Sequence, residues 1–360
     1  MNESVKNPLA INYLSDRQKK ILKYIIEANI EDPEAVASNK LKENLLKEVS
    51  SATIRNDLVS LEKSGFLVKE HTSSGRVPTK MGYQFYVTHL MDSNSEKFKN
   101  IYGEINQIFN KRSESIDVTI NETVKILKKF IQLPIVVNKV TDKNELLKRI
   151  DIVNISLNQF MLFLITSHAN VIKEFIEIEN QVQYEDISAC LRIFNEKLIN
   201  LPINQIINEI HKLDTIIRSK VHQYEFIFQK VIEKIILKIQ QNYYINKPKV
   251  YNVKSLVTKP EVQNHDIDLE KLLDLLENTS IFSQINFNHQ KTGKTLINFD
   301  NSIEGVTLAA TEIEDDSGAK HQIGFLGPMR MDYQLLNQIL EFLCEKLSVK
   351  KPKIKKNEKK

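Results

Sequence analysis

Residues 49–67 read Val-Ser-Ser-Ala-Thr-Ile-Arg-Asn-Asp-Leu-Val-Ser-Leu-Glu-Lys-Ser-Gly-Phe-Leu, and this stretch decides the fold of the N-terminal region. Ser50 stands where it can cap a helix, and Gly65 stands where a glycine commonly ends one. Between them, apolar residues recur at the spacing that places them on one face of a helix: Ile54, Leu58 and Leu61. The stretch therefore predicts an amphipathic helix, a sharp stop and a short apolar strand.

Two more helices are predicted upstream of this one. Ser15 and Gln18 form a capping-box pair, and an apolar stripe follows them: Ile21, Leu22, Ile25 and Ile26. Pro33 interrupts this pattern, after which Ser38 can cap a second, short helix. Only residues 46–49 connect that helix to the third, which is the short spacing of a helix-turn-helix.

The residues after the third helix predict a two-stranded ribbon. The apolar run 66–68 and the pair Arg76-Val77 flank the polar stretch 72–75, which is the pattern of a hairpin with a long tip. Three helices followed by a ribbon are the topology of a winged helix-turn-helix. We therefore expect residues 1–90 to form such a DNA-binding domain.

The outward face of the third helix carries residue types that suit a DNA groove. On a wheel of about 100° per residue, the residues that point away from the apolar stripe are Ala52, Asn56, Val59 and Lys63, with Thr53 and Arg55 on the flanks. Arg55 could donate a fork of hydrogen bonds to guanine or bind a phosphate, Asn56 matches adenine, and Lys63 suits a phosphate. Ser51 and Thr53 lie where hydroxyls and backbone amides approach a phosphate.

A plain polar surface is the competing interpretation, and the helix alone does not decide between the two. The ribbon favours DNA, because Lys69, His71 and Arg76 could flank the duplex backbone beside the helix. Base recognition by His71 is the less favoured of its two roles, since a lone histidine more often forms a hydrogen bond within a turn.

The rest of the chain predicts an α+β sheet domain interrupted by a mainly helical insertion. Strand patterns cover 135–137, 149–155, 159–166 and 171–178, and they return at 295–299, 306–310 and 323–326. Helical periodicity occupies residues 183–243 between these blocks. We expect the sheet domain at 91–182 and 261–348, the insertion at 183–260, and a basic tail at 349–360.

Length and composition exclude several classes of protein. A chain of 360 residues suits two or three domains, and no run approaches the roughly 20 apolar residues of a membrane span. Cys190 and Cys344 are the only cysteines, which excludes a disulfide framework and a cysteine-rich zinc site and makes the cytoplasm the simpler location.

The net charge does not by itself indicate nucleic-acid binding. The whole chain carries +4, but residues 350–360 hold seven lysines against Glu358 and so carry +6, which leaves −2 for the first 349 residues. Such a tail is most often a solvated chain end. Any specific DNA contact must therefore come from local residues.

No catalytic residue, metal site or cofactor is predicted. Gly293-Lys294-Thr295 lacks the glycine that a phosphate-binding loop needs five residues before Gly293, where Asn288 stands. His289 and His321 have no cysteine nearby and no metal-ligand spacing. We expect that the protein is not an enzyme.

The run Gly327-Pro-Met-Arg-Met-Asp332 is a further candidate, as an anion-binding loop before a helix. The structural interpretation is preferred. Gly327 and Pro328 would turn the chain out of a strand, and Arg330 and Asp332 would pair with each other.

Three runs of sequence resemble the heat-inducible transcription repressor HrcA family of bacteria. The first is Val49-Ser-Ser-Ala-Thr-Ile-Arg-Asn-Asp-Leu58, with Gly65-Phe66-Leu67 after it. The second comprises His71-Thr-Ser-Ser-Gly-Arg-Val-Pro-Thr79 and Gly82-Tyr-Gln-Phe-Tyr-Val87. The third, Ile323-Gly-Phe-Leu-Gly-Pro-Met-Arg-Met-Asp-Tyr333, is similar to the closing motif of the family.

The resemblance implies a dimeric repressor of chaperone operons. Its architecture would be a winged helix-turn-helix domain, a GAF-like α+β domain and an inserted dimerisation domain. It would bind an inverted repeat called CIRCE, supported by the GroEL chaperonin. The DNA contacts that the resemblance implies come from two groups: Ser51, Thr53, Arg55 and Asn56 on the helix, and His71, Ser73, Ser74 and Arg76 on the wing. The outward face of the helix adds Lys63 to them.

We therefore expect a cytoplasmic homodimer that represses heat-shock operons from a double-stranded inverted-repeat operator and is released on heat stress. The alternative is a winged-helix regulator controlled by a small-molecule ligand in its GAF-like domain. Phe160, Phe163 and Phe175 could line such a ligand pocket, although plain core positions are the simpler interpretation.

Overall fold

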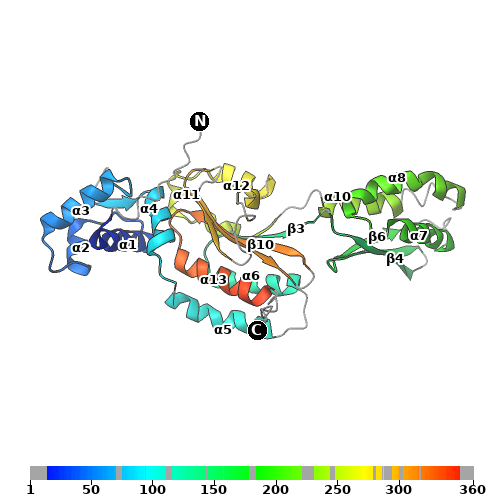
Figure 1. The fold of residues 1–360 in the computed structure, drawn as a ribbon, viewed down its shortest axis with the longest axis horizontal. Helices are drawn as coiled ribbons and strands as arrows, with labels where there is room; N and C mark the ends of the chain where they lie inside the picture. The colour runs from blue at the N-terminus through cyan, green and yellow to red at the C-terminus, as the bar shows by residue number, and fades with distance from the viewer. Residues whose placement is uncertain are drawn as a thin grey trace, which may run out of the picture. The chain divides into compact units, whose positions relative to one another are not determined.

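The chain folds as a mixed α+β protein with an N-terminal helix-turn-helix domain and a β-sheet domain (Figure 1). The computed structural model describes residues 14–69, 75–93, 95–110, 116–142, 144–156, 158–177, 184–220, 231–243, 248–278, 281–285, 287, 294–299, 303–315 and 318–348. These residues form two compact units. Unit 1 holds those within 14–136, 250–311 and 323–346, and unit 2 holds those within 137–249, 312–322 and 347–348.

The helix-turn-helix domain begins unit 1. Its elements are α1 (Asp16–Glu31), α2 (Ser38–Asn44), α3 (Ser51–Lys63), β1 (Leu67–Lys69), β2 (Arg76–Pro78), α4 (Lys80–Phe85) and the π-helix η2 (Tyr86–Leu90). Ser15 and Gln18 form the predicted capping box of α1. The predicted cap of α2 was wrong, because Ala37 holds the cap position and Ser38 is already the first helical residue.

The predicted helical stripes form the core of this domain. Each of the following side chains is at most 3% exposed: Ile21, Leu22, Ile25, Ile26, Ile54, Leu58 and Leu61. In the ribbon Val68 faces Val77, and Val36 exchanges two backbone hydrogen bonds of 3.0 Å with Arg76. The segment before α2 is thus joined to the ribbon, a pairing that the sequence pattern did not indicate.

A five-stranded sheet with the order β7-β3-β10-β9-β8 forms the next part of the fold. Its strands are β3 (Ile135–Val140), β7 (Lys249–Tyr251), β8 (Leu296–Asn298), β9 (Val306–Glu314) and β10 (Lys320–Pro328). The helices around it are α5 (Glu96–Asn110), α6 (Ile116–Phe130), α11 (Pro260–Gln263), α12 (Leu269–Asn278) and α13 (Tyr333–Leu347), with the 3-10 helices η4 (Val253–Leu256) and η5 (Ile281–Gln284).

Helices cover both faces of this sheet, as Figure 1 shows for α12 and α13. Leu308 and Ala310 of β9 lie in one core with residues of α12. Thr311, on the opposite face of the same strand, is hydrogen-bonded to Cys344 of α13 at 2.9 Å. Alternate residues of a strand point to opposite faces, so a strand covered on both sides is buried almost throughout, as β9 is from Val306 to Thr311.

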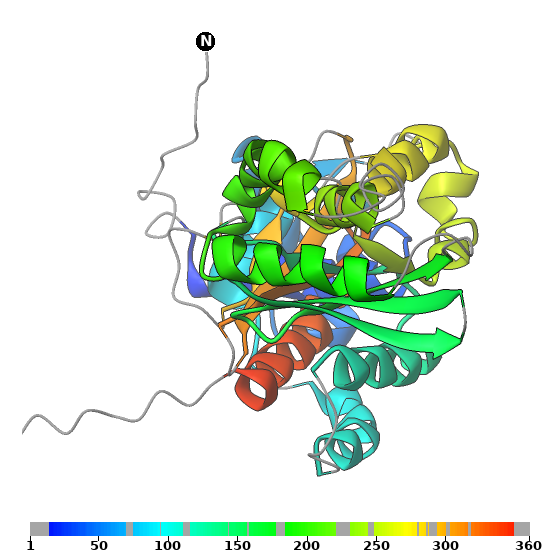
Figure 2. The ribbon, with the colours of Figure 1, turned by 90° about the vertical axis from the view of Figure 1, so that its right-hand side faces the viewer.

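Unit 2 contains a second, three-stranded antiparallel sheet. It consists of β4 (Leu147–Ser156), β5 (Gln159–Thr166) and β6 (Val171–Glu177), joined by hairpins. The helices described after these strands are α7 (Tyr184–Leu198), α8 (Ile203–Lys220) and α10 (Glu233–Tyr243). The helices lie on one side of the strands (Figure 2). Phe160, Leu162 and Leu164 of β5 form a buried core with Phe194 of α7.

This grouping differs from the domain boundary that we expected at residue 183. Strands 147–177, which the sequence pattern assigned to the sheet domain, share one hydrophobic core with helices 184–243. The compact unit therefore starts near residue 137. A strand pattern shows that one face is buried, but it does not show which partner covers that face, so the sequence left the assignment open.

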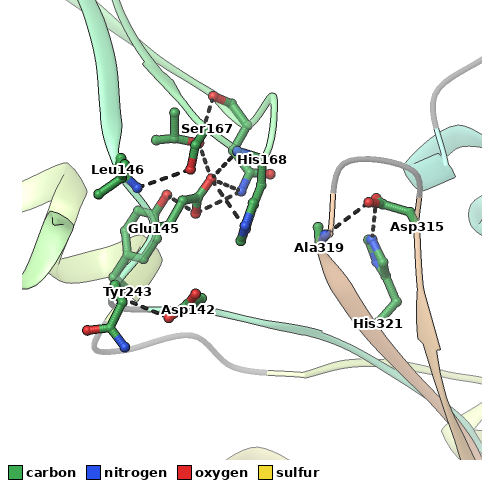
Figure 3. Close-up of polar contacts among 12 residues, drawn as sticks. Asp142, Glu145, Leu146, Ser167, His168, Tyr243, Asp315, Ala319 and His321 are labelled. Carbon is green, nitrogen blue, oxygen red and sulfur yellow. Dashed lines mark hydrogen bonds and ion pairs between the residues drawn. The ribbon is translucent and has the colours of Figure 1, made fainter. Parts of the chain in front are cut away.

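A buried carboxylate joins the beginning and the end of unit 2. Glu145 precedes β4, is 1% exposed and accepts a hydrogen bond from the hydroxyl of Tyr243, the last residue of α10, at 2.8 Å (Figure 3). Tyr243 donates to Oε2 of this carboxylate. The other oxygen, Oε1, accepts from Asn170 Nδ2 and the backbone amide of His168, at 3.0 and 3.1 Å, and from Thr166 Oγ1. Glu145 thereby joins the hairpin turn between β5 and β6 to the segment before β4 and to the end of α10.

Candidate nucleic-acid interface

The start of α3 is fixed by its predicted cap. Ser50 Oγ accepts a hydrogen bond from the backbone amide of Thr53 at 3.1 Å and lies 2.8 Å from Thr53 Oγ1. One of the orphan amides of the helix is satisfied in this way, and the remaining amides of the first turn point outward with the positive end of the helix dipole. Ser51 and Thr53 lie in this turn and are half-buried.

The inner face of α3 is held against α1 by polar contacts as well as by the core. Arg17 Nε donates to Asp57 Oδ2 at 2.6 Å, and Gln18 Nε2 donates to Ser60 Oγ at 3.1 Å. The Asp57 side chain is only 9% exposed. Asp57 was not among the predicted functional residues, although an acidic residue on the buried side of a helical wheel indicates that it has a partner.

The outer face of α3 is open to solvent. Arg55, Asn56 and Lys63 are exposed, and no hydrogen bond or ion pair joins them to any residue that the structure describes. Val59, on the same face, is 41% exposed, and Ala52 is exposed beside it. The predicted orientation of the helix is confirmed. It presents hydrogen-bond donors and small apolar groups outward, and these complement the acceptors and methyl groups of base edges in the major groove.

The end of α3 is a glycine stop. Gly65 has a φ of +80°, its amide donates to Glu62 O at 2.9 Å, and the amide of Phe66 donates to Leu61 O at 3.0 Å. Thr79 Oγ1 then donates to Gly65 O at 2.6 Å. The chain direction out of α3 is therefore set by backbone geometry that favours glycine.

The wing residues divide into two groups. His71, Ser73 and Ser74 lie outside the described residues. We expected Arg76 to extend beside α3 towards the duplex backbone. Instead it pairs with Glu62 at 2.9 Å, and its side chain is only 13% exposed. Glu62 lies on α3, so this ion pair joins the ribbon to the helix and gives Arg76 a structural contact that its position in the sequence did not predict.

Three further lysines belong to the candidate interface. Lys40 and Lys42 of α2 and Lys47 in the turn before α3 are exposed and form no ion pair with any described residue. In helix-turn-helix proteins the first of the two helices crosses the phosphate backbone. These lysines were not among the predicted DNA contacts, although their position on the second helix and in the turn after it is a signal for that role.

The closing motif contacts the helix-turn-helix domain. Arg330 Nε donates to Glu261 Oε1 at 2.7 Å and its Nη1 donates to Ile30 O, near the end of α1, at 3.2 Å. Asp332 pairs instead with Lys97 at 2.9 Å and accepts from the amide of Leu335 at 3.1 Å. The predicted pairing of Arg330 with Asp332 was therefore wrong, because each has a partner elsewhere in unit 1.

Other chemistry is sparse in the part of the chain that the structure describes. His321 Nε2 lies 3.3 Å from Asp315 Oδ2 (Figure 3), and no cluster of histidine, cysteine, aspartate and glutamate with metal-ligand geometry occurs there. None of the helices found there combines the length and apolar character that a bilayer crossing requires. His289 and Gly293 lie outside the described residues.

Comparison with known proteins agrees with this geometry. A family model described as a DeoR-like helix-turn-helix domain matches residues 17–76, and one described as the HrcA protein C terminal domain matches residues 117–336. The heat-inducible transcription repressor HrcA of Mycoplasmoides gallisepticum is 40% identical over 340 residues, which cover 93% of this chain and 95% of that protein. The chain belongs to the HrcA family.

Further comparisons extend the relationship. The HrcA repressor of Mycoplasma genitalium is 36% identical over 338 residues, covering 93% of this chain and 96% of that protein. A crystal structure described as that of a hypothetical protein is 17% identical, with a TM-score of 0.64, and covers 93% of this chain and 98% of its own. That likeness shows the fold alone. The resemblance that the runs at 49–58 and 323–333 indicated is thus confirmed at the level of the HrcA family.

Proposed function

We propose that this protein represses transcription of chaperone operons by binding, as a cytoplasmic homodimer, to an inverted-repeat operator of the CIRCE type. The observation that carries the proposal is the outer face of α3, where Arg55 and Asn56 are exposed and without partners in the described structure. Family membership supplies the class of regulation, and this face supplies a surface that can bind DNA.

The contacts divide into base and phosphate contacts. Arg55 and Asn56 donate to base edges in the major groove, with Val59 and Ala52 against thymine methyl groups. Ser51 and Thr53 bind a phosphate at the start of α3, and Lys63, Lys40, Lys42 and Lys47 add sequence-independent attraction. His71, Ser73 and Ser74 stay proposed wing contacts, whereas the ion pair with Glu62 makes Arg76 a support of the wing.

A second copy of the chain would cover the open face of the sheet of unit 2. Six apolar residues on that face are exposed or half-exposed: Val153, Met161, Phe163, Ile165, Val171 and Phe175. Val153, Met161 and Phe175 form one cross-strand row. A contiguous apolar patch of this kind is typical of an interface between subunits.

Charges on this face suit a two-fold axis. In the neighbouring cross-strand row, Asp151 and Lys173 flank Phe163 of the middle strand. A two-fold axis that runs along β5, over Phe163, would bring Asp151 of each copy towards Lys173 of the other. This is the self-complementary pattern of a symmetric dimer. We therefore assign dimerisation to unit 2 and a GAF-like role to the five-stranded sheet domain.

Induction would be thermal. If the DNA-competent dimer lies only a few kcal/mol below inactive states, heating or loss of GroEL support empties the operator. The rival, a ligand-controlled regulator, has less support. Phe160 faces the helices of unit 2, whereas Phe163 and Phe175 lie on the other face of the sheet, so the three do not line one pocket.

A titration of the purified chain against the inverted repeat of a chaperone promoter tests the function. We expect a retarded complex at physiological salt that needs both arms of the repeat, weakens when salt is raised, and is lost on heating but restored by chaperonin. A duplex of equal length with both arms scrambled is the control. Equal binding to both duplexes would refute sequence-specific repression.

A further inference from the structure

Different parts of unit 1 hold the two ends of α1. Near its start, Arg17 and Gln18 contact α3. Near its end, Asn29 and Ile30 are held by side chains from outside the three helices. A helix rises about 1.5 Å per residue, so the 16 residues of α1 span about 24 Å. Because a helix of this length is stiff, the direction of α3 depends on how the far end of α1 is held.

The far end of α1 lacks a cation of its own. The last carbonyls of a helix have no partner within it and carry partial negative charge, which a nearby cation stabilises. No basic residue lies in the last turn of α1. Arg330, which follows β10, supplies the missing charge and donates to Ile30 O at 3.2 Å.

Arg330 is itself fixed in place by Glu261. The two side chains are 16% and 20% exposed and 2.7 Å apart. The second carboxylate oxygen of Glu261 is buried and has no partner in the described structure. Arg330 is therefore the counter-charge on which this half-buried carboxylate depends, and its guanidinium is held between Glu261 and the end of α1.

A second contact holds the same end of α1. The hydroxyl of Tyr83, in α4, donates to Asn29 Oδ1 at 2.6 Å, and the Tyr83 ring lies 6.1 Å from the ring of Tyr333. Gln334 Nε2 also donates to Glu27 at 3.3 Å. Hydrogen bonds from the closing motif (Arg330) and from the start of α13 (Gln334) thus hold the last turns of α1.

We propose that Arg330 is a positioning residue for operator binding, which fixes the direction of α1, and through it of α3, relative to the sheet domain. The inference rests on the proposed function. One α3 is sufficient for a half-site, but a dimer on an inverted repeat needs both α3 helices at a set separation and direction. Loosening α1 lowers the effective concentration of the second α3 at the second half-site. Arg330 thus governs the advantage of the full operator over a half-site.

The test compares two duplexes of equal length, one with the inverted repeat and one with a single arm scrambled. Their affinities for the full chain are measured by fluorescence anisotropy. For Arg330→Met we expect the ratio of full-operator to half-site affinity to fall by about tenfold or more, with the half-site affinity unchanged. Arg330→Lys, which keeps the charge but not the planar fork, should give a smaller fall, and Tyr83→Phe should lower the same ratio.

Lys97→Met is the matched control. It removes an ion pair with Asp332 at 2.9 Å, in the same segment as Arg330. In the part of the chain that the structure describes, no hydrogen bond or ion pair joins Lys97 to α1, and its charge acts on Glu31 of that helix only at longer range. The ratio should be unchanged. Equal loss of both affinities in Arg330→Met, or no loss, overturns the positioning role. If Arg330→Met does not fold, Tyr83→Phe and Arg330→Lys decide in the same way. A parent chain that shows no preference for the full repeat instead refutes the proposed function.

Discussion

At the scale of single residues, the outer face of α3 makes the sharpest prediction. Arg55→Ala should lower operator affinity by about 1–3 kcal/mol, because a base-directed fork of hydrogen bonds is lost. Lys63→Ala should weaken binding to all sequences alike and reduce the salt slope by about one. Anisotropy titrations at several salt concentrations separate the two effects. Parental affinity in Arg55→Ala would remove this residue from the interface.

Glu27 gives a prediction for pH dependence. Partial burial raises its pKa above the ordinary value of 4.5, against the smaller lowering effects of Lys23 and of the hydrogen bond from Tyr86. A carboxyl group whose pKa is higher in the folded chain than in the unfolded chain favours folding most at low pH, where it is protonated in both chains. This contribution to the free energy of unfolding is lost as the pH rises through the pKa of the folded chain.

Glu27→Gln should therefore raise the melting temperature at pH 7, because the amide mimics the protonated carboxyl group. The gain should disappear when the pH falls below the ordinary glutamate value. Melting curves of parent and variant from pH 4 to pH 8 measure this difference. A gain that is the same at all pH values would show that charge is not its cause.

The residue scale also shows what sequence could and could not predict. Ser15, Ser50 and Gly65 were predicted because a cap or a stop depends on neighbours within a few positions. The partners of Arg330 lie 69 and 300 positions away, and no local pattern encodes such a contact. The arginine was noticed, but its role required the structure.

At the scale of elements, the hydrogen bonds of Glu145 predict how unit 2 loses its structure. Tyr243→Phe removes the hydroxyl that donates to the buried carboxylate at 2.8 Å and should cost about 1–3 kcal/mol, because a bond to a charged acceptor is lost. Amide exchange should accelerate in β4 and α10 before it does so in α3. Tyr251→Phe is the control, since the Tyr251 hydroxyl donates to the neutral Asn121 and should cost less.

The elements themselves were largely predictable, but their partners were not. The pattern placed β5 at the residue numbers that the structure shows and α3 between Ser50 and Gly65, because alternation and helical spacing are local signals. It grouped β4–β6 with the wrong neighbours in space. Apolar residues alternate along β5 because one of its faces is buried. That pattern would be the same whether the covering helices came before β5 in the chain or after it.

At the scale of the whole molecule, the open face of the β4–β6 sheet predicts an association state. Phe175 is 46% exposed at the β6 end of the cross-strand row that it forms with Val153 and Met161. Phe175→Lys should halve the mass measured by light scattering and reduce full-operator affinity towards that of a half-site, while the fold is kept. Val257→Lys is the matched control, because Val257 is 53% exposed but lies in unit 1. If both variants kept the mass of the parent chain, the dimer contact would lie elsewhere.

β3 and β7, the strands in which the longest segment of unit 2 begins and ends, are neighbours in the five-stranded sheet. An intervening segment whose two ends rest on adjacent strands adds little to the entropy of closing the loop, since that term grows only with the logarithm of loop length. Replacing residues 141–248 by a linker of about a dozen residues, enough whichever way the strands run, should yield a chain that still melts cooperatively and binds half-sites. Regulation could then be gained, exchanged or lost at this point of the chain while the framework that carries α3 stays intact.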